Sequence, residues 1–454
     1  MKRLIPTCLL LTLLPFSAAF GFGIRIVDQD AAATARGDAF VATADNPSAI
    51  YYNPAGITQL DGFNARVGTY AIGLHVHYSP EDNGEGLETK EKALFAPQLY
   101  TTYKPPVGPF TLGLGVYSPY GLELDYPDTA PFRTLAKFGQ LKFVTINPVL
   151  AMEVTRTLSV AFGATIDTAQ VDLRRGIEFP AAASFLNGTG NEFKFRGAGT
   201  TAGFNAGILW KPSEQHSFGL SYHSGVTVKF SGHSSAHLSD KQIRAAKQTN
   251  EQIRTANRAI AQIKATVPPQ FQQAALAQFG LPSEPIAEIP TSFPEEDADA
   301  KIRFPQFAMA GYSFRPNKNW NFEADVDWAD WDVLNAVTLN QQTSDKVSLP
   351  FNWKHSWMFE FGATHYFDWQ GLRASAGYVY SLNSVPSGSF NPQVPDSNRH
   401  IFSAGIGQTV HDFSWDVAYQ CAYGPTRTID NQTLADGRYR FISHAVTLSV
   451  GYHF

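Results

Sequence analysis

Several charged residues could bind the carboxylate of a ligand, because such a group needs a cationic hydrogen-bond donor. The candidates are Arg36, in an alanine-rich segment near the N-terminus, and Lys229 and Arg373, which alternation places on the polar faces of two predicted strands. Each could instead be a solvated charge, or a partner for the acidic residues at alternate positions of 323–327. An uncharged ligand would require no such donor.

Two histidines, His75 and His77, lie on one face of a predicted strand, a spacing that would suit a metal ion. A third ligand is not evident, so the sequence predicts polar groups of the lumen or the membrane interface rather than a metal site. The chain also contains no Gly-x-Ser-x-Gly elbow and no phosphate-binding loop. We therefore expect neither catalysis nor a cofactor. A lipase that carries its Ser and His on strands is the enzymatic alternative.

Apolar residues at helical spacing follow Ser239 and Gln242, which fit a capping box. The stripe predicts one helix up to Pro268 and Pro269, and a second short helix that ends at Gly280. The two helices could simply pack on each other. They could also flank a groove for an apolar ligand, with the region around residue 185 as its other wall. That groove would be lined by Phe179, Phe185, Leu186, Ile243, Ile253, Ile260, Phe271 and Leu276.

The first residues have the pattern of a secretory signal peptide. Basic residues 2–3 precede a short apolar core at 4–16, and the small residues Ser17 and Ala19 favour cleavage after Ala19, with cleavage after Gly21 as the alternative. The apolar core is too short and too interrupted to span about 30 Å of hydrocarbon. We therefore assign 1–19 to a signal peptide.

The composition narrows the class of the exported chain. After removal of the signal only Cys421 remains, so no internal disulfide can form. The net charge is −5 without a basic patch, so nucleic acid is not an expected partner. No stretch approaches 18 apolar residues, which excludes helical membrane spans, whereas alternating strands of about 9 to 11 residues can cross a bilayer. A closed β-barrel is the spanning structure that remains.

Strict alternation of apolar and polar residues supports this barrel. It occurs in segments 217–230, 322–328, 372–380 and 413–423, and in the final segment that ends on the aromatic Phe454. A terminal aromatic after such a strand resembles the signal read by the outer-membrane assembly machinery. About fourteen strands are predicted, with short and long connections in turn. The short connections are predicted near 105–109, 155–156, 211–215, 316–318, 368–370 and 411–412.

The stretch 45–56 resembles the N-terminal plug of the FadL/TodX family of outer-membrane transporters for long-chain fatty acids and hydrocarbons. It reads Asp-Asn-Pro-Ser-Ala-Ile-Tyr-Tyr-Asn-Pro-Ala-Gly and follows the alanine-rich 31–35. Ser-Pro-Tyr-Gly at 118–121, Tyr-Pro at 126–127, Pro-Phe-Arg at 131–133 and Ile-Asn-Pro at 146–148 are also similar to the family. The plug motif consists of Asn46, Pro47, Asn53, Pro54 and Ala55.

The resemblance implies a division of the chain into a plug, or hatch, at 20–59 and a transmembrane barrel at 60–454, with an extracellular insertion at 232–302. It also implies a kink in the third strand that opens the wall sideways. Glycine and proline interrupt strand pairing, and the kink is assigned to Gly113, Gly115, Pro119 and Gly121.

The implied function is passive uptake of a hydrophobic small molecule across the outer membrane of a Gram-negative bacterium, with capture at extracellular loops and lateral release. The partners would be the ligand, outer-membrane lipid and lipopolysaccharide, and the barrel assembly machinery. A general polar porin and a surface adhesin without a transport role are the alternatives. Apolar walls do not discriminate a fatty acid from an aliphatic or aromatic hydrocarbon, so the substrate stays open, as do the gating trigger and the oligomeric state.

Overall fold

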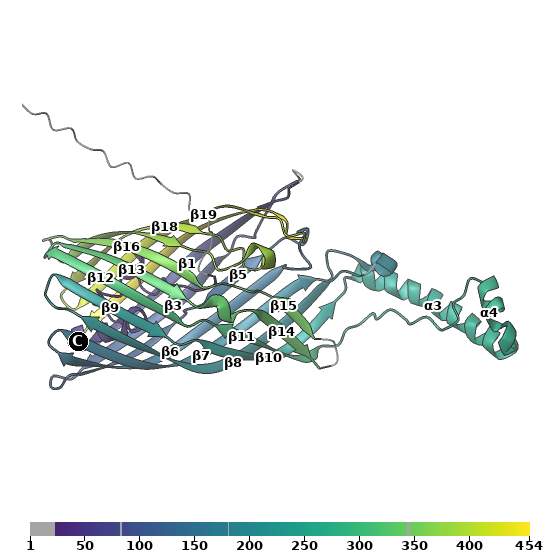
Figure 1. Cartoon of the computed structure of the whole chain (residues 1–454), viewed down its shortest axis with the longest axis horizontal. Helices are drawn as coiled ribbons and strands as arrows, with labels where there is room; N and C mark the ends of the chain where they lie inside the picture. Colours follow the sequence, from purple (N-terminus) through teal and green to yellow (C-terminus); the bar gives the residue numbers. More distant parts are fainter. Residues whose placement is uncertain (1–22, 82–83, 180, 343–345) are drawn as a thin grey trace, which may run out of the picture.

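The computed structural model describes residues 23–81, 84–179, 181–342 and 346–454 as a closed antiparallel β-barrel (Figure 1). The predicted signal peptide lies outside the described residues. The strand segments are β1 (Gly62–Ser79), β2 (Leu87–Glu88), β3 (Ala93–Lys104), β4 (Phe110–Tyr117), β5 (Gly121–Asp125), β6 (Phe138–Thr155), β7 (Leu158–Gly176), β8 (Glu192–Trp210), β9 (His216–His223), β10 (Val226–His237), β11 (Glu296–Phe304), β12 (Phe307–Asn317), β13 (Trp320–Ala329), β14 (Ala336–Gln341), β15 (Val347–Pro350), β16 (Ser356–Tyr366), β17 (Leu372–Ser381), β18 (Arg399–Val410), β19 (Phe413–Ile429) and β20 (Gly437–His453).

These segments form fourteen full-length strands, as the sequence predicts. Five full-length strands are interrupted once and give the pairs β4/β5, β9/β10, β11/β12, β13/β14 and β15/β16, whereas β2 only extends the hairpin edge of β1. β20 pairs with β1 along its length and closes the barrel. This pairing joins the first and last full-length strands, and closure of the sheet is the condition for a sheet in lipid.

The two faces of the wall follow the alternation of the sequence. On β20, Val446, Leu448 and Val450 face outward and are exposed, while Thr447 and Ser449 between them are buried in the lumen. Successive side chains of a strand point to opposite faces, so a pattern of period two produces an apolar outside and a polar inside. The confirmed alternation is therefore the physical origin of the fold.

The two ends of the barrel differ. The C-terminus and the short turns lie at one end, here called the turn end (Figure 1). The long connections lie at the other end, here called the loop end, where α3 (Asp240–Thr266) and α4 (Pro269–Gln278) project away from the barrel. The 3₁₀ helices η2 (Ala181–Leu186), η3 (Trp331–Val333) and η4 (Ser387–Ser389) lie in other connections.

The helices of the structure are few. No helix in the described part of the chain is long and apolar enough to cross a membrane.

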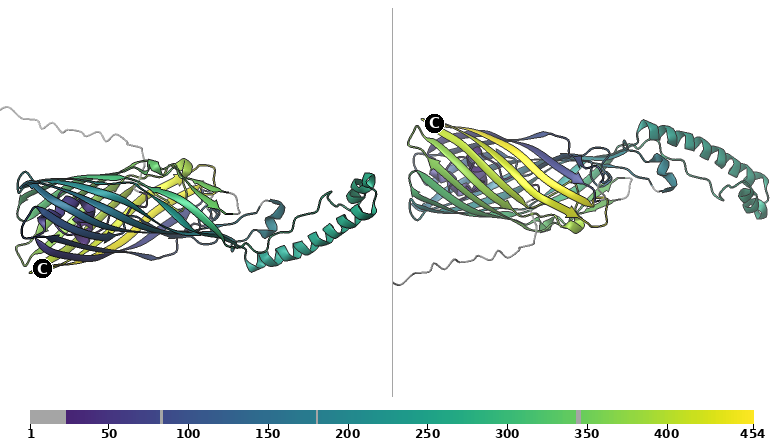
Figure 2. Two further views of the ribbon diagram at one scale, coloured as in Figure 1. Left: turned by 90° about the horizontal axis from the view of Figure 1, so that it is seen from below. Right: turned by 90° about the horizontal axis from the view of Figure 1, so that it is seen from above.

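Residues 23–61, here called the lumen segment, run inside the barrel (Figure 2). The segment contains α1 (Ala31–Thr34), α2 (Ala49–Tyr52) and η1 (Pro54–Gln59). α1 contacts β18, β19 and β20, whereas η1 contacts β4, β6, β7 and β8 on the opposite wall. The side chains of these three elements are almost all buried, so the segment fills the cross-section of the lumen near the turn end.

Candidate functional site

The wall of the barrel has a gap between β3 and β5. The half of β3 nearer the turn end, from Leu99 to Tyr103, pairs with β4. Residues 93–98, nearer the loop end, pair only with β1. β5 pairs only with β6. Unpaired backbone groups at this position are the feature that a sideways opening requires, because no ladder hydrogen bonds must be broken to pass between the two strands.

Ion pairs bridge the loop end of this gap. The Nζ atom of Lys92 lies 2.9 Å from a carboxylate oxygen of Glu123 and 3.2 Å from one of Asp125. The backbone N–H of Lys90 donates to the carbonyl of Asp125 at 2.8 Å, and its Nζ atom lies 3.0 Å from the Asp125 carboxylate. The gap is therefore a window within the wall rather than a slit that runs to its rim.

The first described residues of the chain cover the window from inside. Ile26 donates its N–H to the carbonyl of Pro119 at 2.9 Å, and Gly121 donates to the carbonyl of Ile24 at 3.0 Å, so that Arg25 stands opposite Tyr120 as an antiparallel bridge. A side chain at Gly121 would collide with Ile26, because an added Cβ would lie 2.7 Å from its Cδ1 atom. Sequence reasoning missed Ile24 and Ile26, although their alternation with Arg25 is the signal of an extended segment.

Aromatic side chains line the lumen next to the window. The ring of Tyr120 lies 4.9 Å from that of Phe304 and 5.1 Å from that of Phe143, measured between centroids. The cavity that Tyr120 and Phe143 share with Tyr117 and Phe307 has a volume of only ≈ 30 Å³. Pockets for small organic ligands hold about 300–1,000 Å³, so this cavity is too small for such a ligand.

Two of the four predicted kink residues lie at the interruption between β4 and β5, and two do not. Pro119 and Gly121 flank the position where β4 ends and β5 begins. Gly113 and Gly115 lie inside the regular ladder with β6, opposite Val149 and Asn147, so their assignment to the kink is wrong. Their lack of a side chain instead makes room for the lumen segment, since a Cβ at 115 would lie 2.8 Å from Cγ2 of Ile50.

The Asn-Pro-Ala part of the plug motif fastens the lumen segment to the wall. The buried amide of Asn53 donates to the carbonyls of Val41 and Ile208, both at 2.9 Å, while its Oδ1 atom accepts from the N–H of Ala55 at 3.2 Å and so caps η1. Pro54 occupies the first turn of η1, where its missing N–H costs nothing. Asn53 thus joins two parts of the segment to β8 with one side chain.

The other part of the motif organises the start of α2. Asn46 accepts hydrogen bonds from the N–H of Ser48 at 2.8 Å and from its hydroxyl at 2.6 Å. Its amide donates to Asp30, which caps α1. Pro47 lies between these residues. The motif therefore connects both short helices of the lumen segment.

Three acidic residues at alternate positions of β13 dock the lumen segment on its other side. Glu323 accepts from the N–H of Ala42 at 2.7 Å and contacts the guanidinium of Arg36 at 3.2 Å. The outermost of the three, Asp327, pairs with Arg25. Asp325 completes the set and accepts from the backbone N–H groups of Phe40 and Val41, at 2.8 and 2.9 Å. Buried carboxylates are tolerated where such donors converge on them.

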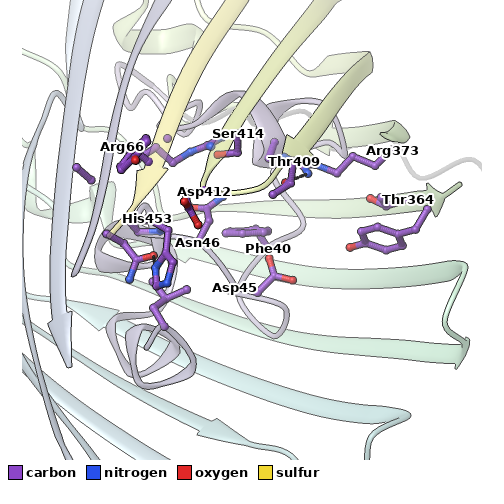
Figure 3. Close-up of a pocket in the computed structure, with 18 of the residues that line it drawn as sticks. Phe40, Asp45, Asn46, Arg66, Thr364, Arg373, Thr409, Asp412, Ser414 and His453 are labelled. Atoms are coloured by element: carbon purple, nitrogen blue, oxygen red, sulfur yellow. Dashed lines mark hydrogen bonds between the residues drawn. The ribbon is translucent and has the colours of Figure 1, made fainter. Parts of the chain in front are cut away.

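The predicted carboxylate contacts divide between two surfaces. Arg36 and Arg373 line one cavity of ≈ 340 Å³ between the lumen segment and the wall at the turn end (Figure 3). Both are already paired, Arg36 with Glu323 and Arg373 with Asp416 at 2.7 Å. They would bind a ligand carboxylate only by exchanging a protein partner.

Lys229 does not face the lumen, so the parity argument is wrong for this residue. His223 is buried inside, but the strand is interrupted at Ser224 and Gly225, and on β10 the buried positions become Val228 and Phe230. The irregularity shifts the alternation by one residue and turns Lys229 to the outer face, where it is exposed.

The residues of the predicted capture groove do not converge. Leu186 of η2 is buried near the base of α3, whereas Phe271 lies beyond its far end and is 59% exposed. α3 has 27 residues, so its two ends are about 40 Å apart.

α3 instead packs against α4 and against the returning chain, where Asn250 and Asn257 bond the backbone of Ile289 and Ile286. Ile243 and Ile253 are half-buried on this helix, and Ile260 and Leu276 are buried. Phe185 is exposed, and Phe179 bonds Asn187 through its backbone.

His77 of β1 has ordinary polar contacts. His77 lies 3.2 Å from Glu88 and 3.0 Å from the hydroxyl of Ser79. Within the described residues, no group of three or more His, Cys, Asp or Glu side chains is arranged to hold a metal ion.

The sequence profile of the family described as outer membrane protein transport protein (OMPP1/FadL/TodX) matches residues 12–454. The chain belongs to this family. It is 22% identical to a long-chain fatty acid transport protein of Salmonella typhi over 91% of this chain and 88% of that protein.

Two solved structures share the fold. A Pseudomonas aeruginosa FadL homologue has a TM-score of 0.75 at 19% identity, covering 95% of this chain and all of that one. The Ralstonia pickettii toluene transporter TbuX has a TM-score of 0.65 at 15% identity, covering 96% and 98%. The protein is thus an outer-membrane β-barrel of a family of transport proteins rather than enzymes, with the turn end in the periplasm and the loop end outside.

Proposed function

We propose that the protein is a channel for the passive uptake of hydrophobic small molecules, long-chain fatty acids or hydrocarbons, which leave the lumen sideways through the window between β3 and β5. The observation that carries this proposal is that residues 93–98 of β3 pair with β1 but have no ladder partner on the side of β5, where residues 24–26 cover the gap from inside. The names of the Salmonella and Ralstonia relatives supply the two substrate classes.

The lumen segment acts in this proposal as a plug with a movable first part. Ile24 and Ile26 contact the window, whereas the motif around Asn53 and the carboxylates of β13 hold the following residues on opposite walls. Withdrawal of residues 24–26 would connect the aromatic cavity to the window without moving the anchored part. The motion would separate Arg25 from Asp327 unless both shift together.

Capture of the ligand would take place at the extracellular end, where apolar side chains are exposed on the insertion. Phe271 in the first turn of α4 and Phe279 at its end are 59% and 69% exposed. A polar porin is disfavoured, because the lumen segment blocks the cross-section of the barrel near the periplasm. A surface adhesin without a transport role is the alternative to which the projecting helices would also be suited.

A reversible disulfide across the window tests the proposal. Arg25 and Tyr120 are a non-hydrogen-bonded antiparallel pair, whose Cα atoms are about 4.5 Å apart in regular ladders, within the range of disulfides. The Arg25→Cys/Tyr120→Cys variant would be made in a Cys421→Ser background and expressed in cells without their own channel of this kind. Uptake of radiolabelled oleate and of toluene would be measured before and after reduction.

We expect the oxidised double variant to lose uptake of whichever of the two ligands the unmodified protein takes up. The reduced form should recover that uptake. The single variants Arg25→Cys and Tyr120→Cys in the same background are the controls, since they lack the crosslink but share the lost side chains. Uptake that is equal in the oxidised and reduced forms would refute lateral release beside residues 24–26. No uptake by the unmodified, folded protein would favour the adhesin.

A further inference from the structure

Three cations gather on the outer surface of the barrel. Lys229 on β10 stands directly opposite Lys301 on β11, and Arg303 lies two residues further on the same face of β11, opposite Thr227. All three side chains are exposed, and no ion pair to any of them occurs within the described residues. Like charges directly opposite each other on a sheet repel, so the arrangement calls for an anion between them.

The three residues lie where the apolar band of the barrel ends on the extracellular side. On the same full-length strand as Lys229, the outward residues Phe218 and Leu220 are exposed apolar side chains, and Tyr222 follows them. On the neighbouring strand, Trp328 pairs with Ala308. Ala308 lies five residues after Arg303 along the chain, on the periplasmic side of it. Tyrosine and tryptophan mark the membrane interface of barrels, so the cations lie at the level of the outer-leaflet headgroups.

The surroundings leave the positive charge largely uncompensated. On the same face of β11, Asp299 lies two residues beyond Lys301, and its carboxylate accepts a hydrogen bond from Asn340 at 3.0 Å. On the other side, Thr200 of β8 is the outward neighbour. By contrast, Arg196 on the adjacent β8 and Arg174 on β7 both contact one carboxylate, that of Asp172.

We propose that Lys229, Lys301 and Arg303 form a binding site for the phosphate groups of lipopolysaccharide in the outer leaflet. The planar guanidinium of Arg303 can hold two phosphate oxygens at once, and the two lysines supply point charges on either side. The lipid A part of this glycolipid places phosphorylated sugars directly above its acyl chains, so one molecule would contact both the cations and the apolar band. The site is independent of the transported ligand.

The test is native mass spectrometry of the whole protein in detergent, with bisphosphorylated lipid A, the same lipid A after removal of its phosphates, and phosphatidylglycerol as probes. The variant is Lys229→Ser/Lys301→Ser/Arg303→Ser. The matched control is Lys241→Ser/Arg244→Ser/Lys247→Ser on α3, which removes the same residue types from another exposed surface. Folding of each protein is checked by its mobility on unheated gels.

We expect the variant to bind bisphosphorylated lipid A on the order of a hundredfold more weakly than the unmodified protein and the control. The dephosphorylated lipid should bind the unmodified protein as weakly as the variant binds lipid A. Equal binding of lipid A by the variant and the control would overturn the site. Binding of phosphatidylglycerol with the same dependence on the three cations would overturn lipopolysaccharide as the occupant.

A second variant covers the case in which the triple change prevents folding. Lys301→Glu places a carboxylate opposite Lys229 and removes the repulsion between the two lysines, so it should not impair the sheet. The Lys301→Glu protein should still bind lipid A more weakly than the unmodified protein. Retention of lipid A by a folded Lys301→Glu protein would also contradict the proposal.

Discussion

At the scale of single residues, the lumen segment depends on places where the wall carries no side chain. Gly207 of β8 lies under the Asn-Pro-Ala motif, and an added Cβ would stand 2.3 Å from Oδ1 of Asn53 and 2.8 Å from Cδ of Pro54. Neither neighbour can move away easily. The Asn53 side chain is fixed by its hydrogen bonds to the carbonyls of Val41 and Ile208, and Cδ of Pro54 belongs to a ring that includes the backbone nitrogen. Gly207 is therefore as much a part of the motif as Asn53.

We expect Gly207→Ala to destabilise the seated lumen segment by about 1–3 kcal/mol, the usual cost of overpacking. The measurement is the rate at which added protease cleaves within residues 23–61 of the protein in detergent. Gly73→Ala on β1 is the matched control, because the nearest atom to its added Cβ is 3.9 Å away. Equal cleavage of the two variants would mean that the motif does not rest on β8.

A second residue-scale feature is the pair of buried carboxyls in the lumen segment, Asp28 and Asp38. Asp38 accepts a hydrogen bond from the hydroxyl of Tyr52 at 2.9 Å, and Asp28 from the amide of Gln420 at 2.7 Å. Burial and the neighbouring charge of Asp28 raise the pKa of Asp38 well above its usual value, and burial also raises the pKa of Asp28. The folded state therefore favours a protonated carboxyl here.

The sign of the pH dependence follows from these directions. A carboxyl whose pKa is higher in the folded than in the unfolded state contributes most below about pH 4, its unfolded pKa, and this contribution is lost as the pH rises through the folded pKa. We expect Asp38→Asn to raise the thermal midpoint at pH 8 and to leave it nearly unchanged at pH 4. Asp45→Asn, at the exposed edge of the segment, should show no such gain. A lower midpoint for Asp38→Asn at pH 8 would contradict a protonated carboxyl at Asp38.

At the scale of elements, β13 holds the lumen segment with carboxylates rather than with a ladder. Glu323 and Asp325 accept from four consecutive backbone N–H groups, Phe40 to Thr43, and the hydroxyl of Thr43 also bonds Glu323. A strand presents alternate side chains to one face, so two acids at this spacing can serve neighbouring peptide groups of a chain that crosses them.

Replacement of both acids by amides, Glu323→Gln/Asp325→Asn, should loosen the lumen segment by about 2–4 kcal/mol, because charge-assisted hydrogen bonds become neutral. Liposomes that contain the variant should admit small sugars, whereas those with the unmodified protein should not. Asp368→Asn in an exposed periplasmic turn is the control. Sugar entry equal to that of the unmodified protein would assign the closure of the lumen to other contacts.

The helical insertion is an element with few ties to the barrel. β10 and β11 pair up to Ser234 and Glu296, so the strands that carry the insertion are joined below it. Replacement of residues 240–289 by a short glycine-serine linker should leave gel mobility and barrel content unchanged. Uptake at low ligand concentration should fall if the exposed apolar tip captures ligand, and unchanged uptake would remove capture from α3 and α4.

At the scale of the whole molecule, the sequence by itself determined the architecture. Alternation with period two and the short and long connections in turn predict about fourteen strands with two unlike ends, and the structure has them. This information is local, because each strand must place apolar side chains on lipid and polar ones inside, whatever its neighbours are. The motif at 45–56 is also local, because this short stretch by itself indicates the family to which the chain belongs.

Only the tertiary structure decided which residues meet. Gly113 and Gly115 accommodate Ile50 rather than bend the wall, Lys229 turns outward after a one-residue irregularity, and the capture residues lie at the two ends of a long helix. The window itself arises from the register of β3 and β5, and its cover from residues 24–26, about 95 positions earlier than the strand they meet. Register and contact between distant segments depend on how the closed barrel aligns its strands, and a local pattern does not encode that alignment.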